Sequence, residues 1–210
     1  ATLNYAEHLL ARAGHPDAHR QPAIVFTSEI VARQEIGWAR LAADTGALTA
    51  TLARLGVRRD DPVAAFMPNI PQAVVALLAT TSLGAIWSAC SPDMGRIAVL
   101  DRFRQIAPKV LIAVDGYRYG GKLYDRRELI HELLAELPSV DHLVLLPSLD
   151  ANADPAEFAN GSAWAQSIAG NAPLQVEHVP FEHPLWVVYS SGTTGLPKPI
   201  VHSQGGIVVE

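Results

Sequence analysis

Short apolar runs alternate with longer segments of helical periodicity along most of the chain. Apolar residues at spacings of three and four favour amphipathic helices, whereas compact runs of β-branched residues favour buried strands. The pattern predicts elements over the following ranges: helix 3–10, strands 23–26 and 31–36, helix 38–55, strand 63–67, helix 70–83, strand 85–89, helix 97–106, strand 110–114, helix 125–137 and strand 142–146. Strands that alternate with helices predict an α/β fold with a doubly wound, mostly parallel sheet flanked by helices.

Residues 147–184 differ in composition from the segments on either side. Asn, Asp, Gly and Pro are frequent there and favour turns, so we expect a connector with one short helix around 162–168. Further short strands are predicted at 185–189 and 200–202. The expected division of the chain is a first α/β subdomain over 1–146, a connector over 147–184, and the start of a nucleotide-binding region over 185–210.

Composition restricts the partners that the chain can bind. The chain has 210 residues of which 49% are hydrophobic, enough for a packed core. A net charge of −5, from 21 acidic and 16 basic side chains, argues against a nucleic-acid partner, which normally requires a basic surface. Small anionic substrates must therefore be bound by a few local cations.

Residues 1–210 are not expected to contain a metal site or a disulfide. The single cysteine, Cys90, excludes an internal disulfide, and we interpret it as a small buried residue rather than a catalytic thiol. The eight histidines lack the spacing of a metal site, so no metal ligand is predicted. Asp60 and Asp61 precede a strand and are interpreted as a solvated face or a turn cap rather than an acid–base pair.

No stretch of the sequence is expected to cross a membrane. The most apolar segment, residues 73–87, is interrupted by Thr, Ser and Gly. It is also shorter than the roughly 20 apolar residues that span a bilayer. No charged and then apolar leader opens the sequence. We expect a soluble, cytoplasmic protein without a membrane partner.

The strongest chemical signal follows the predicted strand 185–189. Glycines permit close backbone approach there, and backbone N–H groups and hydroxyls can donate hydrogen bonds to phosphate oxygens. Lys198 adds a positive charge. We therefore predict a phosphate loop with the binding residues Ser190, Ser191, Gly192, Thr193, Thr194, Gly195 and Lys198.

The loop has two alternative interpretations, a P-loop and a surface turn. The P-loop of nucleotide hydrolases requires Gly-Lys followed by Ser or Thr, whereas Pro197 precedes Lys198 and Pro199 follows it. The P-loop interpretation therefore fails. A surface turn rich in Ser, Thr and Gly would explain the composition but not the complete ordered string.

That ordered string, Tyr189 to Lys198, resembles the signature loop of the adenylate-forming superfamily, which includes acyl-CoA synthetases, luciferases and the adenylation domains of peptide synthetases. The resemblance implies that the loop holds the phosphates of ATP while a carboxylate attacks the α-phosphate, giving an acyl-adenylate and pyrophosphate. Lys198 would then act by electrostatic neutralisation of the phosphates. Pro199 departs from the family pattern, which usually has Gly there, and removes one N–H donor.

Three strings are similar to the acetoacetyl-CoA synthetase branch of this superfamily: residues 84–95, 114–122 and 197–202. The resemblance implies an ATP-dependent acid–CoA ligase that converts acetoacetate, through acetoacetyl-AMP, to its CoA thioester. Its substrates would be acetoacetate, ATP and CoA, with Mg²⁺ as cofactor. Another short-chain acyl-CoA synthetase, acting on acetate, propionate or butyrate, and a non-catalytic nucleotide-binding fragment remain alternatives.

A second candidate site is the string from Arg118 to Lys122, just after the strand 110–114. Ligands gather beyond the carboxyl ends of parallel strands, and the two glycines are expected to let both flanking cations point the same way. In related acetyl-CoA synthetases the corresponding stretch contacts the CoA nucleotide, so the resemblance implies that Arg118 and Lys122 bind CoA. Tyr119 stands where that family has its first arginine. A turn with solvated charges is the alternative.

The resemblance also places several parts of the enzyme after the phosphate loop, outside residues 1–210. These are the Mg²⁺ ligands, the adenine and ribose contacts, the acyl pocket and a catalytic lysine on a small C-terminal domain. We therefore expect the chain to be an N-terminal fragment that completes neither half-reaction alone. An exposed sheet edge would favour its self-association.

Overall fold

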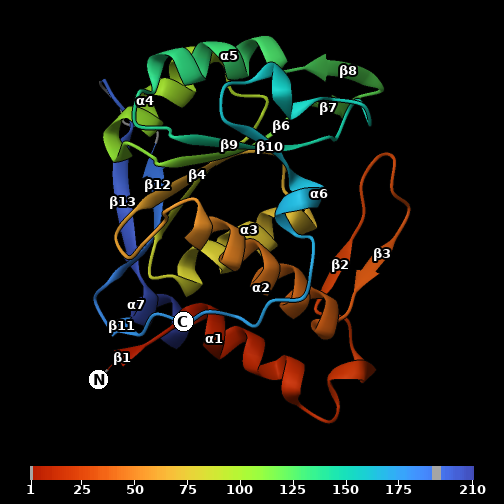
Figure 1. Cartoon of the computed structure of the whole chain (residues 1–210), viewed down its shortest axis with the longest axis vertical. Helices are drawn as coiled ribbons and strands as arrows, with labels where there is room; N and C mark the ends of the chain where they lie inside the picture. Colours follow the sequence, from red (N-terminus) through yellow and green to blue (C-terminus); the bar gives the residue numbers. More distant parts are fainter. Residues whose placement is uncertain (1, 191–194) are drawn as a thin grey trace.

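A seven-stranded mixed sheet forms the centre of the molecule (Figure 1). The computed structural model describes residues 2–190 and 195–210. Neighbouring strands are parallel except for the antiparallel pair β12–β13 at one edge. This confirms the predicted α/β class with a mostly parallel sheet. In spatial order the strands are β10 (Gly161–Ala163), β9 (His142–Leu146), β6 (Val110–Val114), β4 (Pro62–Phe66), β5 (Ile86–Cys90), β12 (Pro184–Ser190) and β13 (Lys198–Ser203).

Helices cover both faces of this sheet (Figure 1). One face packs against α1 (Tyr5–Leu10), α2 (Trp38–Arg54) and α3 (Pro71–Ser82), and the other against α4 (Arg96–Ile106) and α5 (Arg127–Glu136). The shorter helices are α6 (Trp164–Ser167) and α7 (Gln204–Val209), with 3₁₀ turns η1 (Ala11–Gly14), η2 (Ala18–Arg20) and η3 (Pro155–Glu157).

Three small antiparallel sheets lie outside the central one. The first pairs β1 (Thr2–Leu3) with β11 (Val179–Pro180). The others are hairpins: β2 (Ile24–Phe26) with β3 (Gln34–Ile36), and β7 (Gly116–Tyr119) with β8 (Lys122–Asp125). The β2–β3 hairpin projects beside the main body, and its connecting loop reaches toward β7 and β8 (Figure 1).

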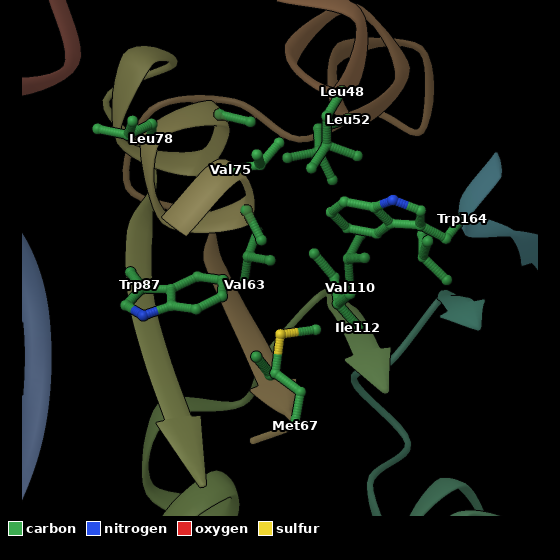
Figure 2. Close-up of a cluster of buried hydrophobic side chains, with 14 of the residues drawn as sticks. Leu48, Leu52, Val63, Met67, Val75, Leu78, Trp87, Val110, Ile112 and Trp164 are labelled. Carbon is green, nitrogen blue, oxygen red and sulfur yellow. The ribbon is translucent and has the colours of Figure 1, made fainter. Parts of the chain in front are cut away.

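Side chains of the central strands alternate between two hydrophobic cores. In β4, Val63 and Ala65 face the core under α1–α3, whereas Ala64 and Phe66 face the core under α4 and α5. Figure 2 shows the first of these cores, where side chains of α2 and α3 lie over those of β4 and β6. Because both faces of a parallel sheet are buried, every position must be apolar, which explains the unbroken apolar run of β6.

The structure differs from the sequence prediction in the segment around residue 161. Gly161–Ala163 is a strand that pairs in parallel with β9, and the helix begins only at Trp164. The prediction of a helix from 162 was wrong there because β10 is short and contains no β-branched residue, so its pairing comes from the backbone. A Cβ at Gly161 would lie 2.1 Å from the carbonyl oxygen of Pro155, so this close approach requires glycine.

A second difference concerns residues 116–125. They form the β7–β8 hairpin, and α5 starts at Arg127 instead of 125. The remaining predicted helices and strands of the core occur within a few residues of their expected ranges. Within the two described ranges, no helix combines the length and the apolar character needed to cross a membrane.

Candidate functional site

The predicted phosphate loop connects the antiparallel strands β12 and β13 at one edge of the sheet. Ser190, the last residue of β12, is paired with Lys198, the first residue of β13. Gly195 has a φ of +119°, a conformation that favours glycine. The structure therefore brings the two ends of the loop together. Four of the predicted binding residues lie outside the described ranges: Ser191, Gly192, Thr193 and Thr194.

Lys198 is exposed, and the opposite Ser190 is half-buried. A mobile ammonium group that remains in water is accessible to an anionic ligand, and a hydroxyl beside it can donate a hydrogen bond. Both groups belong to strand ends and not to the flanks of a long loop. Their backbone positions are thus set by the ladder between β12 and β13.

The core holds β12 in place. Leu185 and Val187 are buried, and β12 runs parallel to β5. The buried Ser88 hydroxyl of β5 donates a hydrogen bond of 2.9 Å to the carbonyl oxygen of Val187. The strand that leads into the loop is therefore part of the sheet interior.

Helix α4 contacts both flanks of the loop. The Tyr189 hydroxyl donates to the carbonyl oxygen of Arg102 at 2.9 Å, and the Arg102 guanidinium lies 5.6 Å from the centre of the Tyr189 ring. On the other flank, the Gln105 side-chain amide donates to the carbonyl oxygens of Pro197, at 2.9 Å, and of Asp101, at 2.6 Å. The pKa of Tyr189 is raised mainly by burial, which keeps its hydroxyl protonated and able to donate.

These α4 contacts were not found from the sequence. Arg102 and Gln105 stand about ninety residues before the loop, in a helix whose pattern indicates only amphipathic packing. Their i, i+3 spacing puts them on one side of α4. That spacing has meaning only once the position of the loop is known.

Pro199 occupies the edge strand β13, opposite Tyr189. Proline lacks the N–H that an interior strand must donate, and so it is confined to edge strands and bulges. Ile200 and Val201 of the same strand are 44% and 56% exposed. The expected exposed sheet edge is therefore present at β13 among the described strands.

The second candidate site is the tip of the β7–β8 hairpin. Gly120 and Gly121 connect the strands with φ values of +57° and +73°. Two successive positive φ values are typical of the tight turns that match strand twist, and they strongly favour glycine. A two-residue connection forces close cross-strand pairing of the flanking residues.

That pairing corrects one expectation. Tyr119 is paired with Lys122, and Arg118 with Leu123. Because successive side chains of a strand point to opposite faces, Arg118 and Lys122 lie on opposite faces of the hairpin, and the expectation that both cations point the same way was wrong. Neither forms an ion pair with a carboxylate of the described residues.

A cavity of about 840 Å³ lies beside this hairpin. It opens beyond the carboxyl ends of β4, β5 and β9, where open α/β sheets bind ligands. Arg118 lines the cavity and Lys122 does not. The lining comes from five segments: residues 26–31 with Gln34 of the β2–β3 hairpin, residues 68–72, 91–93 and 146–148, and residues 117–119 with Tyr124 of the β7–β8 hairpin.

A buried carboxylate anchors the start of the hairpin. Asp115 is 1% exposed, and its carboxylate accepts hydrogen bonds from three successive backbone N–H groups. These belong to Ser148 at 2.6 Å, Leu149 at 2.9 Å and Asp150 at 2.7 Å. Asp115 therefore ties the end of β6 to the loop after β9, which forms one wall of the cavity.

Arg126 ties the other side of the hairpin to a second wall. Its Nε donates to the carbonyl oxygen of Pro92 at 2.7 Å, and its Nη2 donates to the Tyr117 hydroxyl at 3.1 Å. The rings of Tyr117 and Tyr124 stack with centroids 4.9 Å apart. The side chains that shape the cavity are therefore linked to one another.

The interpretation of Cys90 is confirmed. It is 2% exposed, and burial raises the pKa of its thiol to about 12, which makes it a poor nucleophile. The turn interpretation of Asp61 is also confirmed, since its carboxylate accepts from the backbone N–H of Arg58 at 2.8 Å and from Lys109 at 3.0 Å. Over residues 2–190 and 195–210, no group of three or more His, Cys, Asp and Glu side chains could hold a metal ion.

The comparison with protein families identifies the class of protein. The family described as AMP-binding enzyme matches residues 13–210. The chain belongs to this family of AMP-binding enzymes.

Particular relatives within that class are acetoacetyl-CoA synthetases. The chain is 42% identical over its whole length to acetoacetyl-coenzyme A synthetase of Rhizobium meliloti (strain 1021), and 36% identical over 99% of its length to acetoacetyl-CoA synthetase of Mus musculus. A solved structure of acetoacetyl-CoA synthetase from Streptomyces lividans covers all of the chain at 50% identity with a TM-score of 0.93. The chain spans about a third of each, 32% of the two proteins and 31% of the solved chain.

Proposed function

We propose that the complete protein is an AMP-forming acid–CoA ligase whose acid is acetoacetate. The observation that carries the proposal is the match of all of this chain, at 50% identity, to part of an acetoacetyl-CoA synthetase structure. The match covers all of the chain, and so it includes the strands β12 and β13. Because the chain covers only about a third of these relatives, we propose the reaction for the complete protein.

In the first half-reaction, a carboxylate oxygen of acetoacetate attacks the α-phosphorus of ATP. A new P–O bond forms, the bond between the α-phosphorus and the bridging oxygen breaks, and pyrophosphate leaves. Ser190 and Lys198 lie together at the mouth of the phosphate loop, where they would bind the phosphates. We assign Lys198 the role of neutralising the charge that pyrophosphate carries away. Ser191, Gly192, Thr193, Thr194 and Gly195 complete the proposed phosphate-binding set.

In the second half-reaction, the CoA thiolate attacks the carbonyl carbon of acetoacetyl-AMP. A C–S bond forms, the C–O bond to AMP breaks, and the thiol proton passes to solvent. We assign CoA-phosphate binding to Arg118, which lines the cavity, and more weakly to Lys122 on the other face of the hairpin. The cavity volume of about 840 Å³ falls in the range of small-molecule sites.

The proposal includes Mg²⁺ as the partner of ATP, with ligands outside residues 1–210. The roles proposed for Ser190, Lys198 and Arg118 need no metal ligand from the described residues. We further propose that the protein works in the cytoplasm on small molecules, without a nucleic-acid or membrane partner. We also propose the division of the chain into a first subdomain (1–146), a connector (147–184) and the start of the nucleotide-binding region (185–210). In this division, β10 belongs to the connector and pairs with β9 of the first subdomain.

The proposed function is tested by acid-dependent exchange of labelled pyrophosphate into ATP. Exchange by the complete natural gene product is measured with acetoacetate, acetate, propionate and butyrate, and the rates are compared. The 210-residue chain is assayed in the same way. Strongest exchange with acetoacetate supports the reaction and the acid together. Strongest exchange with another acid would replace acetoacetate by that acid, and binding of ATP without exchange would favour a non-catalytic nucleotide-binding protein.

A further inference from the structure

The Gly120–Gly121 turn already binds a carboxylate of the chain. The backbone N–H of Gly120 donates to Oε1 of Glu29 at 2.9 Å, and the N–H of Gly121 donates to Oε2 at 3.4 Å. Glu29 lies in the loop between β2 and β3, 91 residues earlier in the sequence. Both carboxylate oxygens therefore face this pair of amides.

Such a pair of adjacent amides is an anion site. Successive N–H groups in a turn form a concave surface that donates hydrogen bonds to carboxylate or phosphate oxygens. Arg118 precedes the turn and Lys122 follows it, so the local charge favours an anion. The Glu29 carboxylate shows which atoms would contact a phosphate at the same place.

The contact lies at the edge of the cavity, because Glu29 lines it and so do Arg118 and Tyr119, the two residues before Gly120. Glu29 and its neighbours in the β2–β3 loop form one side of the cavity, and the β7–β8 hairpin forms another. A ligand that places a phosphate on the two amides must displace the Glu29 carboxylate. Displacement is not costly, because the contact is exposed to water and the β2–β3 ladder contains only three residue pairs.

We propose that Glu29 occupies the position of a CoA phosphate on the Gly120 and Gly121 amides, competes with that phosphate, and so sets the affinity for CoA. This rests on the proposed function, since it assumes that CoA is the ligand of the cavity. A phosphate monoester carries more charge and more acceptor oxygens than a carboxylate, and it also attracts Arg118. CoA therefore displaces Glu29, but its affinity is lower than an unoccupied site would give.

The test is the Michaelis constant for CoA in the complete natural gene product, at saturating ATP and acetoacetate. Glu29→Ala removes both hydrogen bonds and the charge, and it should lower the KM for CoA about three- to tenfold, the value of one or two exposed hydrogen bonds. Glu29→Gln keeps one acceptor and should give an intermediate value. Pyrophosphate exchange, which needs no CoA, is measured in parallel, so that failure of the proposed function is recognised separately.

Glu35→Gln is the matched control. Glu35 is an exposed carboxylate on β3 of the same hairpin, and it pairs with Arg33 instead of the amides. It should leave the KM for CoA unchanged. An unchanged or raised KM in Glu29→Ala would overturn the proposal, because Glu29 would then be irrelevant to CoA or would help to bind it.

Shortened substrates identify the competing group. Pantetheine lacks the nucleotide phosphates, so its KM should be the same in wild type and in Glu29→Ala. A lowered KM for pantetheine would contradict competition with a phosphate. If the 3′-phosphate is the competing anion, Glu29→Ala improves CoA more than 3′-dephospho-CoA. If the diphosphate competes, both improve equally.

Discussion

The β12–β13 hairpin and the β7–β8 hairpin both carry, at a connection between strands, the groups that we propose bind anions, but the two hairpins are held in different ways. β12 is a strand of the central sheet, and α4 contacts the residues on both sides of its loop. The β7–β8 hairpin lies outside the central sheet. It is held by polar and aromatic side chains, chiefly Asp115, Arg126 and the stacked Tyr117 and Tyr124.

This difference suits the two half-reactions that we propose. The first requires a loop that places phosphates against an attacking carboxylate, and a rigid support favours that. The second requires a site that CoA can enter and leave, and a hairpin that lies outside the central sheet and is held by a few side-chain contacts allows it. Changes in the first region should therefore affect adenylation, and changes in the second should affect CoA binding or local stability.

The largest expected effect comes from Lys198→Ala. Removing the charge from the end of the phosphate loop should lower the rate of pyrophosphate exchange by about 100-fold or more, the typical cost of one electrostatic group at a reacting centre. The measurement is exchange with acetoacetate in the complete protein. Arg20→Ala, which removes an exposed cation far from the loop, is the control. Exchange at the wild-type rate in Lys198→Ala would remove this lysine from the site.

Asp115→Ala should destabilise the second region. Three backbone N–H groups would lose a buried charged acceptor, at a cost of about 2–3 kcal/mol in the free energy of unfolding. Denaturant unfolding of the 210-residue chain measures this. Asp154→Ala, which removes an exposed cap that accepts from a single N–H, should cost much less. Equal costs for the two variants would show that Asp115 does not anchor the hairpin.

Arg118→Ala and Lys122→Ala distinguish the two faces of the hairpin. Arg118 lines the cavity, so its removal should raise the KM for CoA about tenfold, the worth of a charged hydrogen bond. Lys122→Ala should raise it less, because Lys122 is not among the residues that line the cavity. Steady-state kinetics with varied CoA measures both. A larger effect of Lys122→Ala would mean that CoA binds on the opposite face.

Gln105→Ala tests the support of the phosphate loop by α4. Loss of the hydrogen bond to Pro197 should lower the exchange rate about three- to fivefold through poorer positioning. The KM for CoA should change little. Arg104→Ala is the control, because Arg104 is the adjacent exposed residue and pairs with Glu136 on α5. If both variants reduced exchange equally, the loss would reflect α4 in general and not its contact with the loop.

The smallest expected effect is a pH dependence at the end of β8. Hydrogen bonding from Arg127 lowers the pKa of Asp125, so the Asp125 carboxyl group loses its proton more readily in the folded state than in the unfolded state. The contribution of the Asp125 carboxylate to stability is therefore present above its unfolded-state pKa of about 3.9. This contribution is lost as the pH falls through the lower pKa of the folded state. The difference in Tm between wild type and Asp125→Asn should shrink between about pH 5 and pH 3.

Asp141→Asn removes another exposed carboxylate and serves as the control for that measurement. A difference for Asp125→Asn that grows on acidification would contradict the assigned pairing with Arg127.

The regular core could be predicted from the sequence because its pattern is local. The alternation of β4, β6 and β9 between two cores follows from uninterrupted apolar runs, and α2 follows from its apolar stripe. β10 could not be predicted, since Gly161–Ala163 joins the sheet through backbone pairing with β9 alone. The hairpin at 116–125 was not predicted, because each of its strands has only four residues and lacks an apolar run.

The candidate sites were predicted to different degrees. The phosphate loop is a continuous string, so its residues could be recognised together, and the structure adds the pairing of Ser190 with Lys198. The candidate CoA site was predicted from one short string, whereas the cavity beside it draws its lining from five separate segments. Glu29 had no recognisable signal, because its contact joins residues 91 positions apart.

By itself, the sequence determined the α/β class, the sequence of core elements, the burial of Cys90 and the string that we assign to phosphate binding, all of which depend on neighbouring residues or on the period of a single element. Only the tertiary structure decided the strand order, the contact of Gln105 with Pro197, the opposite faces of Arg118 and Lys122, and the carboxylate of Glu29 on the Gly120 and Gly121 amides. The physical reason is that these features are set by which backbone segments pack or pair across long sequence separations. Hydrophobic periodicity indicates which face of an element is buried, but not which partner covers it.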